Sequence, residues 1–173
     1  MAHIPKTVDL LGAYPQETQD QAHALRESGE LATILLKRYP DQHTITDNAA
    51  LYRYVMDLKR SYMKQSPPLS KIRYNDKLST LKQALGTHTY VTRIQGRKLK
   101  TKNELRVSSL FKVLPPEFLR MIAVHELAHL RHKDHDKGFY QLCNYMEPDY
   151  HRYEFDLRLW LFSEQHAPVR PTQ

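Results

Sequence analysis

The apolar segment that starts at Pro115-Pro116-Glu117 constrains the fold of this chain most. Proline in a first turn and an acid near the positive end of the helix dipole both favour a helix start. We therefore predict a helix that runs from here to about His132. On such a helix His125 and His129 are one turn apart and differ by only about 40° around the axis, so their imidazoles can meet at one point.

Two histidines at this spacing, with an acid directly after the first, predict a metal site with hydrolytic chemistry. His125 and His129 can each place a ring nitrogen on one zinc ion. Glu126 can take a proton from water that the metal activates. We therefore predict a zinc-dependent hydrolase with Glu126 as its catalytic acid/base.

A catalytic zinc site needs a third protein ligand and an open position for water. The chain offers five candidates: His132, His135, Glu147, His151 and Glu154. His132 shares the helix face of the first two histidines, and three ligands in line give poor tetrahedral geometry. His135 reaches the metal if the helix ends near His132 and the chain folds back. We favour His135 and expect His132 to lie in solvent or just behind the ligands.

The first half of the chain predicts helices. The pattern from Glu17 to Tyr39 is helical, and Gly29 is expected to split it into two. A further helix should run from a cap at Thr46 or Asp47 to Tyr62.

The second half predicts a small sheet followed by helices around the metal helix. The strand candidates, which carry β-branched and aromatic residues, are Lys71–Tyr74, His88–Ile94 and Glu104–Phe111. Two closing helices should follow the metal helix, one over Phe139–Met146 and one over Tyr150–Phe162. The length of 173 residues fits one domain. We predict a single α+β domain over residues 16–165 with a mostly antiparallel sheet, a loose N-terminus over 1–15 and a tail over 166–173.

The net charge of +7 is unevenly distributed. Residues 51–113 hold 15 Lys/Arg against 3 Asp/Glu, a net charge of +12, while the flanking segments are slightly acidic. The positive charge is densest where five basic residues fall within ten positions: Arg93, Arg97, Lys98, Lys100 and Lys102. Segment 93–102 is therefore a candidate for binding phosphates or nucleic acid, with Arg97 and the three lysines as anion-binding residues. The alternative is a solvated strand edge on which charges discourage aggregation.

Cysteine usage and hydropathy predict a cytoplasmic protein. The single cysteine, Cys143, cannot form an internal disulfide, as expected in a reducing compartment. No apolar run approaches the ~20 residues of a membrane helix, and the first residues do not resemble a signal peptide. We expect no membrane partner. Cys143 is expected to be a core residue, and it would be a ligand only if the zinc were structural.

The segment His125–Tyr140, HELAHLRHKDHDKGFY, resembles the YgjP-like metallohydrolase family, which is related to SprT-like and WLM metalloproteases and carries the pattern HELxHLxxxxHxxxFW. Tyr140 stands in place of the tryptophan, and the similarity extends upstream through Glu104–Val107. The resemblance implies a zincin-type fold in which His125, His129 and His135 bind one zinc ion and Glu126 is the acid/base. Many relatives carry R-W-G-S-C where this chain has residues 93–97, so only Arg93 carries over there.

Three functions fit these features. The resemblance implies peptide hydrolysis, with an extended peptide held along the edge of strand Glu104–Phe111 and with Arg93, Tyr140 or Tyr145 stabilising the oxyanion. The first alternative keeps the metal and changes the substrate to a nucleotide, as in a UTP-type pyrophosphatase, since the +12 segment attracts phosphates. The second is a DNA-associated metalloprotease or a basic binding protein. Imidazole ligands also accept other divalent metals than zinc.

Overall fold

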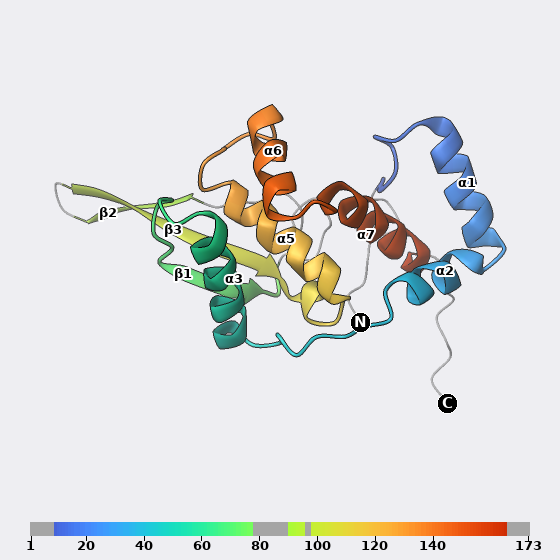
Figure 1. Ribbon diagram of the computed structural model, residues 1–173, viewed down its shortest axis with the longest axis horizontal. Helices are drawn as coiled ribbons and strands as arrows, with labels where there is room; N and C mark the ends of the chain where they lie inside the picture. The colour runs from blue at the N-terminus through green and yellow to red at the C-terminus, as the bar shows by residue number, and fades with distance from the viewer. Residues whose placement is uncertain (1–8, 78–89, 96–97, 166–173) are drawn as a thin grey trace.

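A computed structural model describes residues 9–77, 90–95 and 98–165, with only the backbone described for 90–95 and 98–102. Helix α5 lies at the centre, with the sheet and α3 on one side, α7 on the other, and α1 and α2 beyond α7 (Figure 1). In chain order the elements are α1 (Gln16–Glu27), α2 (Glu30–Arg38), α3 (Asn48–Tyr62), β1 (Lys71–Asn75), β2 (Tyr90–Gln95), β3 (Lys98–Ser108), the short 3-10 helix η1 (Ser109–Lys112), α5 (Pro116–Ala128), α6 (Lys137–Met146) and α7 (Tyr150–Glu164).

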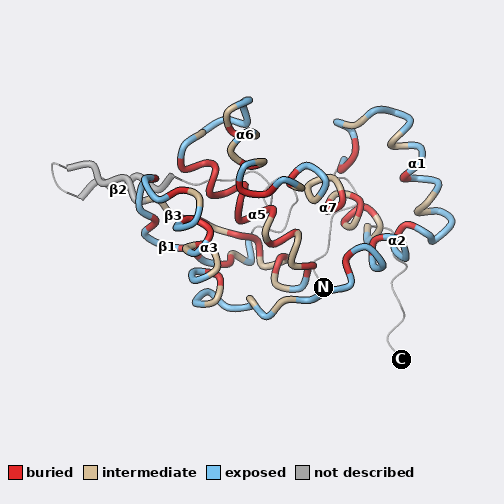
Figure 2. The backbone as a smooth tube through the Cα atoms, viewed as in Figure 1, coloured by how far each residue is buried: buried red, intermediate tan, exposed pale blue. Residues whose placement is uncertain are grey.

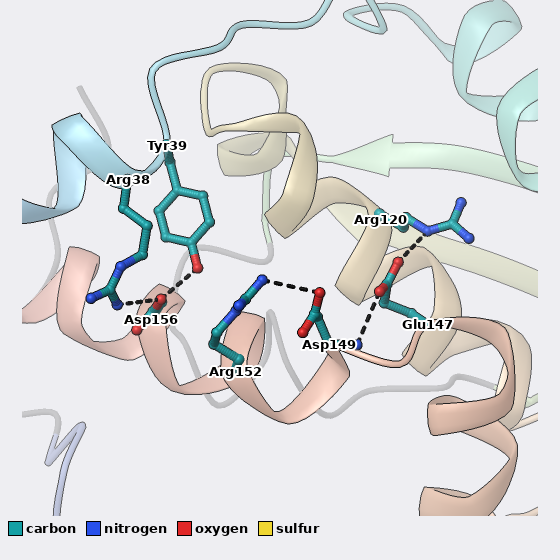
Figure 3. Close-up of polar contacts among 7 residues, drawn as sticks. All are labelled: Arg38, Tyr39, Arg120, Glu147, Asp149, Arg152 and Asp156. Atoms are coloured by element: carbon teal, nitrogen blue, oxygen red, sulfur yellow. Dashed lines mark hydrogen bonds and ion pairs between the residues drawn. The ribbon is translucent and has the colours of Figure 1, made fainter.

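The expected break at Gly29 is confirmed. Gly29 separates α1 from α2 with a φ of 77°, a left-handed conformation that glycine adopts without steric cost. The end of α2 is fastened to α7, because Arg38 and the Tyr39 hydroxyl both donate to the buried carboxylate of Asp156, with an Arg38 Nη1–Asp156 Oδ2 distance of 2.9 Å (Figure 3). Burial, and then the hydrogen bond to Asp156, raise the pKa of Tyr39, so its hydroxyl stays a donor.

Helix α3 also begins where the sequence predicts. The Asp47 carboxylate accepts a hydrogen bond from the Ala50 amide at 2.7 Å, which caps the helix. Leu51, Val55 and Leu58 form its buried stripe. This helix packs against β1 and α5, so α3 covers the sheet at its edge strand β1.

The sheet is mixed rather than mostly antiparallel. The strand order is β1-β3-β2; β1 pairs with residues 104–108 of β3 in parallel, and β2 pairs with residues 98–103 in antiparallel fashion. The parallel pairing places Ile72 beside Leu105 and Tyr74 beside Val107, and all four side chains are buried. In this register the alternating buried residues of both strands lie on the same face of the sheet. A shift by one residue would move one set to the other face, so burial of this face favours the observed pairing.

Strand β3 differs from the expected strand Glu104–Phe111 at both ends. It begins at Lys98, because the basic run pairs with β2 in an antiparallel ladder, and it ends at Ser108, where η1 begins. Residues 104–108 pair with β1, and β2 pairs only with residues 98–103, so the expectation that the segment after Glu104 offers a strand edge to a peptide stays a prediction.

The hydrophobic core is centred on α5 (Figure 2). Every residue from Met121 to Leu130 is buried, since α3, α6, α7 and β3 all pack against this helix. Pro116 occupies the first turn, as predicted. The helix ends at Ala128, and tight turns continue the chain to His132, the expected end, with the His132 amide still bonded to the Ala128 carbonyl at 3.0 Å.

The proposed domain limits, residues 16 and 165, stay a prediction. Just before the first limit, Leu10 and Leu11 are buried in the core and Tyr14 packs on Phe155. The predicted tail, residues 166–173, lies outside the described part of the chain. Among the described helices, none has the length and hydropathy needed to cross a bilayer.

Candidate metal centre

Three histidine side chains converge at the end of α5. The Nε2 atom of His129 lies 3.2 Å from that of His125 and 3.1 Å from that of His135. Nitrogens bound to one tetrahedral zinc ion at about 2.0–2.1 Å are about 3.3 Å from each other. The spacing of these nitrogens therefore fits a shared metal ion, and the three residues form the group of side chains in the described part of the chain that could hold one.

The loop after α5 brings His135 back to the helix. The chain turns after Ala128, and Asp136 then caps α6 by accepting a hydrogen bond from the Phe139 amide at 2.8 Å. His125 and His129 are buried, whereas His135 is exposed. The site therefore faces solvent on the side of His135, where a substrate can enter.

The second ring nitrogen of each buried histidine is held by a hydrogen bond. His125 Nδ1 lies 2.7 Å from the Tyr150 hydroxyl, and His129 Nδ1 lies 2.9 Å from the carbonyl oxygen of His132. A neutral imidazole that donates from Nδ1 has its Nε2 lone pair free for a metal. The carbonyl, which can only accept, thus favours at His129 the tautomer that metal binding requires, and the hydroxyl, which can accept, allows it at His125.

Phe139 forms the apolar side of the site. Its ring centroid lies 5.0 Å from that of His125, 4.7 Å from that of His129 and 4.8 Å from that of His135. Packing against one buried ring restricts the rotamers of all three histidines. Such restriction pre-orders the metal ligands.

Glu126 is almost completely buried, with 2% of its surface exposed, and lies next to His125 on α5. A buried carboxylate beside a metal is suited to hold and transfer a proton. Its role as the acid/base stays a prediction.

The other candidate third ligands have different surroundings. The Glu147 carboxylate accepts from Arg120 Nε at 2.5 Å and from the Asp149 amide at 3.0 Å (Figure 3). Glu154 pairs with Arg158 at 3.3 Å, and His151 is exposed and stacks on Tyr140. The ring of His132 is turned toward Asp136, 3.5 Å away, while its carbonyl supports His129, so it lies behind the ligands as expected.

The two tyrosines proposed to stabilise the oxyanion occupy different places. The Tyr140 ring lies 6.3 Å from that of His135 and is half-buried. Tyr145 follows Tyr140 by about 1.4 turns of α6, is exposed and packs on Tyr62 of α3. The structure therefore brings Tyr140 close to His135 and directs Tyr145 elsewhere.

The candidate basic residues cannot be placed by their side chains. Arg97 lies outside the described residues, and so do the side chains of Arg93, Lys98, Lys100 and Lys102. The backbone of Arg93 lies in β2, opposite Lys100 of β3.

Cys143 is a core residue, as expected. It is fully buried on α6, and burial raises the pKa of its thiol to about 12. A thiol that keeps its proton at neutral pH is a poor metal ligand. The structure therefore gives no support to a structural zinc site closed by Cys143.

Sequence reasoning missed Tyr150 and Phe139 as neighbours of the histidines. Tyr150 is the first residue of α7, 25 residues after His125, and it is one of eleven tyrosines. No local pattern connects it to the site. Phe139 begins one of the predicted closing helices, and its place four residues after His135 is the one available signal.

Metal-dependent hydrolases are the class of enzyme in which a helix and the loop after it bring three imidazoles together beside a glutamate in this way. Comparison with known proteins places the chain in that class. A family model described as "YgjP-like, metallopeptidase domain" matches residues 96–159. A relative from Escherichia coli (strain K12) named "UTP pyrophosphatase" is 50% identical over 151 residues, which cover 87% of this chain and 90% of the relative. The chain belongs to the YgjP-like family. No solved structure matches it.

Proposed function

We propose that this protein hydrolyses a phosphoanhydride bond of a nucleoside triphosphate, with UTP as the first substrate to test. The observation that carries the proposal is the 50% identity, over 90% of its length, to a protein named UTP pyrophosphatase. Identity at this level over nearly the whole chain favours a shared substrate class. The three-histidine group supplies the site at which the chemistry would occur.

The proposed cofactor is one zinc ion per chain, held by His125, His129 and His135. Three imidazoles with an open fourth position are the usual ligand set of catalytic zinc, although the same nitrogens also bind manganese, nickel or iron. When bound, the metal supplies a Lewis acid that makes water a stronger nucleophile near neutral pH.

In this proposal Glu126 takes a proton from the attacking water and passes it to the oxygen of the departing pyrophosphate. The water oxygen bonds to the α-phosphorus, the bond from that phosphorus to the bridging oxygen breaks, and the products are the nucleoside monophosphate and pyrophosphate. The triphosphate carries several negative charges, so the basic residues Arg97, Lys98, Lys100 and Lys102 are its proposed binding partners.

Peptide hydrolysis is the second candidate, and the description of the family as a metallopeptidase domain favours it. Zincin-type peptidases bind an extended peptide by adding it to a strand. Here residues 104–108 of β3 pair with β1, and β3 contacts α5, so a peptide would need to use another strand or a different side of β3.

The experiment is product analysis on protein reconstituted with one equivalent of zinc. UTP, CTP, ATP and GTP are incubated separately, and nucleotides and pyrophosphate are quantified by chromatography, with a mixed peptide library in parallel. Release of UMP and pyrophosphate in equal amounts, dependent on metal, supports the proposal. Peptide cleavage without nucleotide turnover would replace it with the second candidate.

A DNA-associated role and a cytoplasmic location stay predictions. No comparison points to a nucleic-acid partner. Metal-independent, salt-sensitive DNA binding by segment 93–102, with no turnover of either substrate class, would favour a basic binding protein instead.

A further inference from the structure

We propose that Tyr150 and Glu154 of α7 are positioning residues for the metal centre: the Tyr150 hydroxyl holds the imidazole of His125, and Glu154 in turn holds that hydroxyl. The inference rests on the metal site of the proposed function. It makes α7, which contributes no metal ligand, a determinant of metal affinity.

The first contact is a short hydrogen bond inside the core. His125 Nδ1 and the Tyr150 hydroxyl oxygen are 2.7 Å apart, and the two residues are 5% and 0% exposed. Because His125 Nε2 faces the other histidines, a bound metal leaves Nδ1 as the nitrogen that carries the proton. His125 therefore donates and the phenol oxygen accepts.

The second contact uses the proton of the phenol itself. Glu154 follows Tyr150 by four residues, so the two side chains lie on one face of α7, where the carboxylate can accept a hydrogen bond from the phenol. In the proposal the phenol oxygen accepts from His125 and the phenol donates its own proton to Glu154. Arg158 Nη2 balances the carboxylate at 3.3 Å. The proposed chain of contacts runs from His125 through Tyr150 and Glu154 to Arg158.

The start of α7 is itself fixed against α5. Arg120 donates from Nη2 to the Met146 carbonyl at 3.0 Å. Arg120 also donates from Nε to Glu147 at 2.5 Å, and Glu147 also accepts from the Asp149 amide at 3.0 Å (Figure 3). Tyr150 is the next residue. These contacts hold the phenol at a fixed distance from the helix that carries His125.

The two buried histidines are supported differently. His129 is held by a backbone carbonyl of its own loop, which no side-chain substitution removes. His125 depends on a side chain from another helix. A carboxylate that acts through a phenol increases the basicity of the imidazole and fixes its orientation, and loss of such support commonly lowers metal affinity about 10- to 100-fold.

The test compares zinc dissociation constants by chelator competition. The variants are Tyr150→Phe, which removes only the hydroxyl, and Glu154→Gln. Tyr153→Phe is the control, because it makes the same change on the same helix at a ring that packs on Tyr39. We expect Tyr150→Phe to weaken binding about 10- to 100-fold, Glu154→Gln to weaken it less, and Tyr153→Phe to leave it within about twofold.

Two further readouts separate positioning from a general loss of structure. The visible spectrum of bound Co²⁺ should change in Tyr150→Phe and stay the same in Tyr153→Phe, while the metal-free forms of both variants should melt at similar temperatures. Wild-type affinity and spectrum in Tyr150→Phe, or in Glu154→Gln if the first variant does not fold, would overturn the inference and leave the proposed function intact. Failure of the wild-type protein to bind metal would overturn the metal site itself.

Discussion

Arg120 and Glu147 form an ion pair between the middle of α5 and the end of α6, with 2.5 Å between Nε and Oε2. Both side chains are largely buried, and the second carboxylate oxygen of Glu147 accepts from the Asp149 amide. Glu147 therefore accepts hydrogen bonds both from a side chain of α5 and from the backbone just before α7. Its position links the metal helix to the entry of α7.

Glu147→Ala should destabilise the protein by about 2 kcal/mol, because it leaves a partly buried guanidinium and a backbone amide without their acceptor. Urea unfolding measures the effect. The control is Asp57→Ala, which breaks an exposed ion pair with Arg60 and should cost less than about 0.5 kcal/mol. Equal losses in the two variants would show that the Glu147 pair contributes no more than a surface pair.

His135→Ala should remove most of the bound metal, whereas His132→Ala should retain it. Loss of a direct ligand costs more than the ~10- to 100-fold typical of a residue behind a ligand. His132 supports His129 through its backbone carbonyl, which alanine keeps. Elemental analysis of protein purified without a histidine tag distinguishes the two. Metal retained in His135→Ala would assign the third ligand elsewhere.

Glu126→Gln should keep the metal and lose about 100- to 10,000-fold in kcat, the usual contribution of a general acid/base. The amide has the same size but cannot accept the proton. Glu117→Gln, on the first turn of the same helix, is the control and should retain activity. Full turnover in Glu126→Gln with metal bound would remove this residue from the mechanism.

Glu104 should contribute stability that depends on pH. Burial acts to raise the pKa of its carboxyl, but the hydrogen bond and charge of Arg106, together with the charge of Arg73, lower it below the usual 4.5. Because the pKa is lower in the folded state, this stability is present above pH 4.5 and is lost as the pH falls through the folded-state value. Glu104→Gln should cost about 1 kcal/mol at pH 7 and less at pH 3, measured by denaturant unfolding. A constant difference at both pH values would contradict this prediction.

Replacing Lys98, Lys100 and Lys102 together with alanine should raise the KM for UTP several-fold and change kcat less, because charge attraction acts mainly on binding. The wild-type KM should also rise with ionic strength, and the triple variant should respond less. An unchanged KM would favour the solvated-edge interpretation of these lysines. The same proteins, titrated with DNA at two salt concentrations, test the nucleic-acid alternative.

Local sequence signals predicted the elements well because each signal acts within one turn. Gly29 breaks the first helix, Asp47 caps α3 and Pro116 opens α5, and each does so through its own backbone or nearest amides. The spacing of His125 and His129 likewise requires only helix geometry.

Contacts between distant segments could not be predicted in this way. The position of β3 between β1 and β2 depends on which buried faces pack together, and three short strands allow several orders. The hydrogen bond between His125 and Tyr150 depends on the packing of α7 against α5. The position of His135 could be predicted only in part. It depends on a turn after the helix that the sequence permits but does not require.

The unbroken burial of Met121–Leu130 has a consequence for the lifetime of the protein. Two of the three proposed ligands lie within the core itself, so a metal ion that binds them stabilises the folded chain directly. A metal at 100 times its dissociation constant adds about 2.7 kcal/mol to the free energy of unfolding. Under metal starvation, the cell would then lose protein molecules to unfolding and proteolysis as well as losing activity.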